Sequence, residues 1–179
     1  MDIKEVFEKR KSIRKYKAQE VEDEKLKQCL QAFRLAPSAC NLQPYKVFIL
    51  KGKAKDDFCK KVFTGAYSAC SFAAKAPIII AVASSKKTFT GWAGNQIQGT
   101  DFPLIDIGIA GEHFILEAAA LGLGTCWLGW FSKKEADKAL KLGIGEKTEI
   151  LISLGYPDEE PKDRPRKKEE ELFFFKEDL

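Results

Sequence analysis

Residues 101–129 have the sequence DFPLIDIGIAGEHFILEAAALGLGTCWLG, which carries the strongest secondary-structure pattern of the chain. Apolar or small side chains recur every three or four residues from 101 to 121, and this spacing predicts a long helix. Small residues at 110, 111 and 118–120 allow other elements to approach closely, so we expect the helix to be buried on more than one side. Its expected stripe consists of Leu104, Ile107, Gly111, Phe114, Ala118 and Leu121.

Three further elements are expected after this helix. Gly122 and Gly124 end it, because glycine readily adopts the left-handed conformation that closes helices. Residues 125–131 are predicted to form a strand, 133–142 a surface helix and 149–155 another strand.

Two amphipathic helices and two buried strands are expected in the first half of the chain. Residues 2–10 have apolar side chains at helical spacing behind Asp2, a residue type that suits the N-cap. Residues 21–35 repeat the pattern, which stops before Pro37 because proline disfavours helix in the preceding residue. Strands are predicted at 46–51 (KVFILK) and 76–84 (APIIIAVAS), which are apolar, β-branched and bounded by turn residues.

Residues 84–102 (SSKKTFTGWAGNQIQGTDF) have no sustained periodicity. Phe89 and Trp92 stand isolated among polar residues and glycines. Irregular connections of this length inside a compact domain are commonly functional lids. The residues alone leave open whether this segment is a substrate lid or a tolerated surface insertion.

Length and composition indicate one globular domain over residues 1–179. Hydrophobic residues make up 45% and charged residues 31%, as is usual for such domains. The net charge of +4 is modest, so we expect no nucleic-acid partner bound through general phosphate neutralisation. Five cysteines without a CxxC pair and a single histidine argue against a metal site.

The same features favour a cytoplasmic location. An odd number of unpatterned thiols is typical of a reducing compartment. The N-terminus has acidic residues and no apolar signal segment. The longest apolar runs, at 78–83 and 105–110, are too short to cross a membrane, so no membrane partner is expected.

The end of the chain combines charge with exposed apolar residues. After Pro157 the sequence is highly charged, and it then finishes with Leu172, Phe173, Phe174 and Phe175. Three consecutive phenylalanines have no use in a solvated tail, so we expect this end to pack on another surface.

Four short segments could together hold one anionic, aromatic cofactor. Residues 10–14 (RKSIR) and 164–166 (RPR) offer cations and a hydroxyl for a phosphate. Residues 36–44 (APSACNLQP) and 124–129 (GTCWLG) mix small residues, amides and an aromatic, which suits a flat heterocycle. Taken singly, each segment has an ordinary alternative: a solvated basic helix end, a solvated basic tail, a turn and a core strand.

In this set and order the four segments resemble the FMN-dependent nitroreductase family, and the resemblance covers nearly the whole chain. It implies an α+β fold with a mixed, largely antiparallel sheet flanked by helices. It further implies an obligate homodimer in which a domain-swapped C-terminal extension embraces the partner. Two FMN sites would then be shared between the two chains.

The resemblance also assigns roles to residues. Arg10, Lys11, Ser12 and Arg14 would contact the phosphate and ribityl, and Arg14 would lie near the flavin N1–C2 edge and stabilise the anionic reduced flavin. Backbone N–H groups of Leu128 and Gly129 would reach the flavin N5 and O4, so Arg14 and Gly129 are the expected catalytic residues. The other expected cofactor contacts are Arg164 and Arg166 at the phosphate, Trp127 as packing, and Pro37, Ser38, Asn41 and Gln43 from the second protomer.

The activity implied is ping-pong transfer of hydride from NAD(P)H, through flavin N5, to a small acceptor such as a nitroaromatic or quinone. Relatives of the same fold carry out dehalogenation, enone or azoline dehydrogenation, or flavin breakdown, and a non-catalytic flavin-binding protein would show the same segments. We find no G-x-S-x-G elbow and no Rossmann glycine motif. His113 and Glu117 have a spacing that usually stabilises a helix face, although it also allows a base–carboxylate dyad.

Overall fold

The computed structural model describes residues 2–85 and 99–176, and its centre is one four-stranded sheet. The strands are β1 (Tyr45–Lys51), β2 (Ile78–Ser85), β3 (Gly124–Leu128) and β4 (Glu146–Gly155), in the order β1-β2-β4-β3. All three pairs of neighbouring strands are antiparallel, and a single parallel bridge joins Ser12 to Thr125. The expected α+β class with a largely antiparallel sheet is therefore confirmed.

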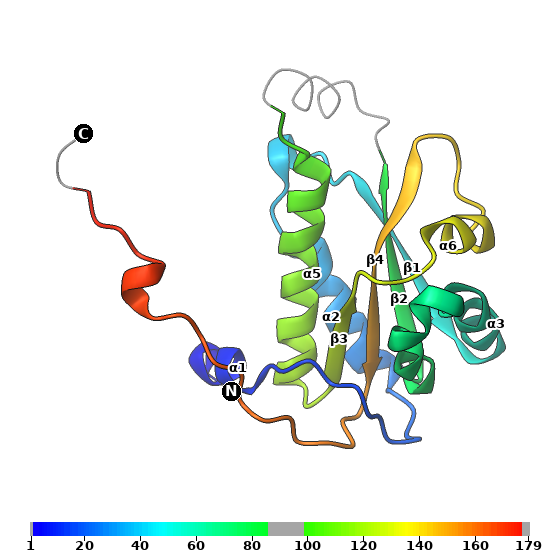
Figure 1. Cartoon of the computed structure of the whole chain (residues 1–179), viewed down its shortest axis with the longest axis horizontal. Helices are drawn as coiled ribbons and strands as arrows, with labels where there is room; N and C mark the ends of the chain where they lie inside the picture. The colour runs from blue at the N-terminus through cyan, green and yellow to red at the C-terminus, as the bar shows by residue number, and fades with distance from the viewer. Residues whose placement is uncertain (1, 86–98, 177–179) are drawn as a thin grey trace.

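Helices cover both faces of the sheet (Figure 1). One face carries α2 (Asp23–Leu35) and α5 (Phe102–Ala120), with α1 (Ile3–Lys9) beside them. The other carries α3 (Gly52–Val62), the 3-10 helix η2 (Gly65–Lys75) and α6 (Lys133–Ala139). Two shorter 3-10 turns are η1 (Ala39–Asn41) and η3 (Glu169–Glu171).

Because the sheet is covered on both faces, successive residues of β2 enter different cores. Ile78, Ile80 and Val82 pack with α2 and α5, whereas Ile79 and Ala81 pack with α3, η2 and α6. A strand buried on both faces needs apolar residues at every position. This need explains the unbroken apolar run that predicted the strand.

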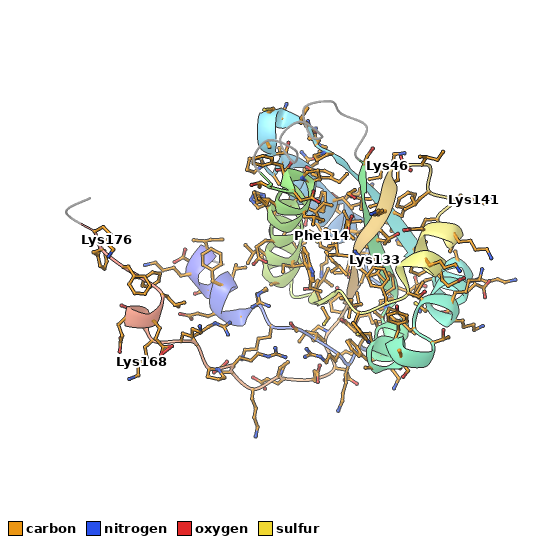
Figure 2. All side chains as sticks on the ribbon, turned by 45° about the horizontal axis from the view of Figure 1, so that its top comes forward. Lys46, Phe114, Lys133, Lys141, Lys168 and Lys176 are labelled. Atoms are coloured by element: carbon orange, nitrogen blue, oxygen red, sulfur yellow. The ribbon has the colours of Figure 1, made fainter. Side chains whose placement is uncertain are left out.

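The long helix forms as expected and fills the middle of the first core. Of its expected stripe, Ile107, Gly111, Phe114 and Ala118 are buried, and Phe114 lies in the interior of the molecule (Figure 2). The stripe was wrong at Leu104, whose side chain remains 45% exposed. Among the helices of the described residues, none combines the length and the apolar character that a membrane span requires.

Close backbone packing gives a first testable prediction. A Cβ on Gly155 would lie 2.5 Å from Cδ of Pro77 and 3.0 Å from Cδ1 of Tyr16, both on rigid rings. We therefore expect Gly155→Ala to lower the free energy of unfolding by about 1–3 kcal/mol in a urea titration. Gly143→Ala, which would make only ordinary contacts with Glu146, is the matched control and should change it by less than about 0.5 kcal/mol. Equal effects of the two substitutions would contradict this account.

Candidate functional site

The two cationic segments, at opposite ends of the sequence, line one cleft of about 600 Å³. The cleft lies where the end of α1 meets the tail, which we define as residues 157–176 (Figure 1). We call it the cationic cleft. It is lined by Phe7, Glu8, Arg10, Lys11, Ser12, Pro161, Lys162, Asp163, Arg164 and Arg166.

Backbone pairing aligns the tail with the segment after α1. Tyr16 and Pro157 form an antiparallel bridge, and the Asp158 N–H donates to the Lys15 carbonyl at 2.9 Å. Glu159 adds a side-chain contact, because its Oε1 accepts the N–H of Arg14 at 2.5 Å and that of Lys15 at 3.1 Å. These contacts set the register that brings Arg164 and Arg166 to Arg10.

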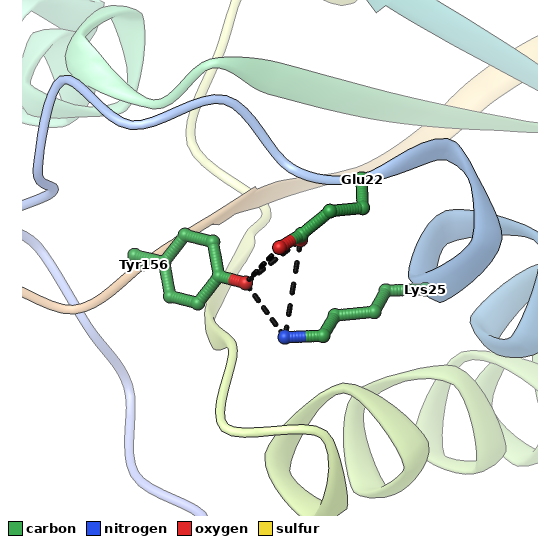
Figure 3. A network of polar contacts seen from close by, with 3 residues as sticks. All are labelled: Glu22, Lys25 and Tyr156. Carbon is green, nitrogen blue, oxygen red and sulfur yellow. Dashed lines mark hydrogen bonds and ion pairs between the residues drawn. The ribbon is translucent and has the colours of Figure 1, made fainter.

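A polar network fixes the point from which the tail departs (Figure 3). The Tyr156 hydroxyl contacts both carboxylate oxygens of Glu22, at 2.7 and 2.9 Å, and accepts from the Lys25 ammonium at 2.6 Å. The hydrogen bond from Tyr156 lowers the pKa of the Glu22 carboxyl. The end of β4 is thereby tied to the start of α2.

The cations of the cleft are not equivalent. Lys11 Nζ lies 2.5 Å from the Asp163 carboxylate and 3.2 Å from the Pro161 carbonyl, and its hydrogen bond lowers the pKa of Asp163. Within residues 2–85 and 99–176, Arg10, Arg164 and Arg166 have no carboxylate partner. Three guanidinium groups around one cleft are therefore free to bind an anion, whereas Lys11 already has a partner.

The strand β3 begins beside the cationic cleft and leads away from it. The Ile13 N–H donates to the Thr125 carbonyl at 2.8 Å, and a Cβ on Gly124 would lie 2.7 Å from the Ile13 side chain. Trp127 packs on α5, where its ring lies so close to Gly111 that a Cβ there would clash with it. Gly129, just beyond the strand, has no heavy atom within 4 Å of its Cβ position.

Arg14 lies outside the cleft lining. Its guanidinium donates to the Ser12 carbonyl at 3.2 Å and lies 5.9 Å from the centre of the Phe72 ring. Phe72 belongs to η2, an element that the sequence pattern did not reveal. The side chain is exposed, so its charge is accessible to a ligand that lies along β3.

The loop 36–44, which carries Pro37, Ser38, Asn41 and Gln43, does not meet the cationic cleft within one chain. The loop is tied to α5 at Asp106, whereas α1 packs near Ala120. These two positions are separated by about 21 Å of helix, at 1.5 Å per residue. Figure 1 shows the loop and α1 at opposite ends of α5.

Three further points of the sequence analysis concern the lid, metal binding and the pair His113 and Glu117. Phe89 and Trp92, and with them most of the expected lid, lie outside the described residues. In the described chain, no group of three or more His, Cys, Asp and Glu residues could hold a metal ion. His113 and Glu117 are neighbours on α5, beside an apolar hollow shared with α1.

The residues of the cationic cleft and β3 fit FMN. Free guanidinium groups and the Ser12 hydroxyl suit its phosphate, and the open backbone at Gly129 leaves room for a flat ring. The family model described as "Nitroreductase family" matches residues 7–68 and 60–156. The chain belongs to the nitroreductase family.

Relatives of this nitroreductase-family chain occur in archaea and bacteria. A protein of Archaeoglobus fulgidus, provisionally named NADH dehydrogenase/NAD(P)H nitroreductase, is 31% identical over 84% of this chain and 83% of its own. A nitroreductase family protein of Clostridium difficile superposes with a TM-score of 0.84 at 26% identity over 100% of both chains. An FMN-dependent nitroreductase from another strain of that species gives a TM-score of 0.75 at 30% identity, covering 95% of this chain and 96% of its own.

Proposed function

We propose that this nitroreductase-family chain is an FMN-dependent NAD(P)H oxidoreductase that reduces small acceptors such as nitroaromatics or quinones by a ping-pong mechanism. The observation that carries the proposal is the cationic cleft, in which Arg10, Arg164 and Arg166 have no carboxylate partner within the described chain. The names of similar proteins support it, since one is called FMN-dependent and another an NAD(P)H nitroreductase.

The cleft and β3 would hold the two ends of the cofactor. Arg10, Ser12, Arg164 and Arg166 would bind the phosphate with charge-assisted hydrogen bonds. Lys11 would contribute from its pair with Asp163, and backbone N–H groups of Leu128 and Gly129 would face the ring edge. When bound, FMN supplies the centre that takes hydride from NAD(P)H and passes it to the acceptor.

A second copy of the chain would complete each site. The separation of the loop 36–44 from the cleft supports this, because Pro37, Ser38, Asn41 and Gln43 cannot line the same cleft of their own chain. The tail supports it too, since Leu172, Phe173, Phe174 and Phe175 are 51% to 92% exposed. We therefore propose a homodimer with two shared FMN sites.

The state of the cysteines favours a cytoplasmic location. All five cysteines are free thiols, which is typical of a reducing compartment.

The visible spectrum tests the proposal as a whole. The protein as purified should be yellow, and adding NADPH or NADH without oxygen should bleach the flavin band, which a nitroaromatic or quinone then restores. A colourless protein that does not take up added FMN would refute cofactor binding. A yellow protein that neither nucleotide bleaches would indicate a flavin-binding protein without this activity.

The charge of Arg14 should affect redox chemistry more than binding. Because its guanidinium is exposed beside Phe72, removing the charge should disfavour negative charge on a reduced ligand there. We expect Arg14→Gln to make the flavin potential more negative by about 30 mV or more, the two-electron equivalent of ~1.4 kcal/mol. Spectroelectrochemistry measures this shift. Lys15→Gln removes the same charge from the neighbouring residue and should shift the potential less; equal shifts would remove Arg14 from this role.

A further inference from the structure

Asp106 is a buried carboxylate on α5 with one protein hydrogen bond. It is 3% exposed, and its Oδ1 accepts the Ala39 N–H at 3.0 Å. Its Oδ2 is buried without a partner in the described chain, and so is the hydroxyl of Tyr45. Burial and, after it, the Asp106 charge raise the pKa of the Tyr45 hydroxyl.

Such a carboxylate weakens the folded state. Burying a charged group costs free energy unless several hydrogen bonds replace the lost water. Asp106 has one such bond from protein. On α5 it lies next to the buried Ile107 and one turn from the buried Ala110, so an apolar side chain at this position would avoid the cost. Stability therefore does not explain the residue.

The hydrogen bond of Asp106 holds the loop 36–44, whose backbone conformation is unfavourable without outside contacts. Cys40, Asn41 and Gln43 have φ angles of 51°, 54° and 46°, the left-handed region that non-glycine residues rarely adopt. Inside the loop, the Gln43 N–H donates to Ser38 Oγ at 3.0 Å and the Gln43 amide to the Asn41 carbonyl at 3.1 Å. The Ala39–Asp106 bond ties this strained unit to the rigid helix α5.

We propose that Asp106 is a positioning residue, which holds Ala39 so that the loop presents Ser38, Asn41 and Gln43 in one fixed arrangement to the flavin bound by the second copy. The part of this inference that concerns the flavin rests on the proposed function. The part that concerns the loop rests on the contacts within this chain. Asp106 thus lowers the free energy of unfolding, but it keeps the loop 36–44 in one conformation.

Removing the Asp106 carboxylate should therefore change thermal stability and FMN affinity in opposite directions. In the Asp106→Leu variant, the melting temperature of the FMN-free protein should stay the same or rise. If leucine does not fit, Asp106→Ala takes its place with the same expectation. FMN should bind at least about tenfold more weakly, and the amides of Asn41, Leu42 and Gln43 should exchange hydrogen faster. Asp106→Asn keeps an acceptor for Ala39 and should remain close to the wild type in binding and exchange.

Thr148→Val is the matched control. Thr148 is fully buried on β4, and its hydroxyl has no hydrogen-bond partner within the described chain. It is far in sequence from the loop, so removing this hydroxyl should leave FMN binding unchanged. The proposal is overturned if Asp106→Leu and Asp106→Ala bind FMN like the wild type with unchanged loop exchange. It is also overturned if Asp106→Asn weakens FMN binding and speeds loop exchange as much as they do. A wild-type protein that binds no FMN would refute the proposed function. Hydrogen exchange of the loop is measured without FMN, so it would still show whether Asp106 orders the loop.

Discussion

Replacing both Arg164 and Arg166 with alanine should weaken FMN binding about a hundredfold or more. Each guanidinium lines the cationic cleft without a carboxylate partner in the described chain, so both are available to a phosphate. A charge-assisted hydrogen bond contributes about 1.5–3 kcal/mol, and at least one such bond is lost at each position. Fluorescence titration of the FMN-free protein gives the dissociation constant.

Riboflavin separates the phosphate from the rest of the ligand. Because riboflavin has no phosphate, its binding should hardly change in the Arg164→Ala/Arg166→Ala variant. Lys167→Ala/Lys168→Ala removes the same charge from the next two residues, which do not line the cleft, and should leave FMN binding nearly intact. Equal losses for FMN and riboflavin would show that the arginines do not bind the phosphate.

Removing residues 170–179 should produce aggregated or flavin-free protein. The tail extends away from the body of the chain (Figure 1). Its Phe175 is 92% exposed. Apolar side chains arranged in this way need a second surface, which we propose is the other copy. Light scattering coupled to size exclusion, read together with flavin absorbance, measures both effects.

A full-length variant controls for the shortened chain. Phe173→Ser/Phe174→Ser/Phe175→Ser keeps the backbone and the charges of the tail, and should also lose the dimer. A truncated chain that stays a soluble yellow monomer would contradict both the interface and the shared site.

Strong periodicity made the long helix and the central strands predictable. Residues 101–121 were expected, and α5 spans Phe102–Ala120. The strand expected at 125–131 ends at Leu128, because Trp130 turns toward η2 and donates to the Ala66 carbonyl at 2.8 Å. The helix expected at 133–142 ends at Ala139, and Lys141 has a left-handed φ of 53°.

The sequence analysis missed η2, and it also missed α3 and the start of β4, each of which has one buried charged residue. No element was predicted over 52–75, where α3 and η2 lie. Lys55 faces inward from α3 and donates to the Ala74 and Ala76 carbonyls, which a hydrophobic pattern cannot reveal. Likewise β4 begins at Glu146 rather than 149, because Lys46 pairs with the buried Glu146 carboxylate at 2.7 Å.

The cationic residues of the candidate site could be predicted from the sequence. The contacts that hold these residues in place could not. The charges at Arg10, Arg164 and Arg166 stand out in the sequence, and the structure brings them to one cleft. Glu159, which binds two backbone N–H groups, resembled any other acidic residue of a charged tail. The lid interpretation of residues 84–102, which include Phe89 and Trp92, stays a prediction.

The central claim is that each flavin site combines the cationic cleft of one copy with the loop 36–44 of the other, and mixed dimers test it most directly. Arg164→Ala/Arg166→Ala damages the cleft, and Asn41→Ala/Gln43→Ala damages the loop. Two differently tagged variants can be co-expressed and the mixed dimer purified through both tags. One of its two sites would contain both damaged halves and the other neither.

We expect each variant alone to bind FMN weakly, and the mixed dimer to bind one FMN per dimer with wild-type affinity, at about half the wild-type NAD(P)H oxidation rate. A mixed dimer that binds FMN as weakly as either variant alone would contradict the account, because each site would then be built from a single chain.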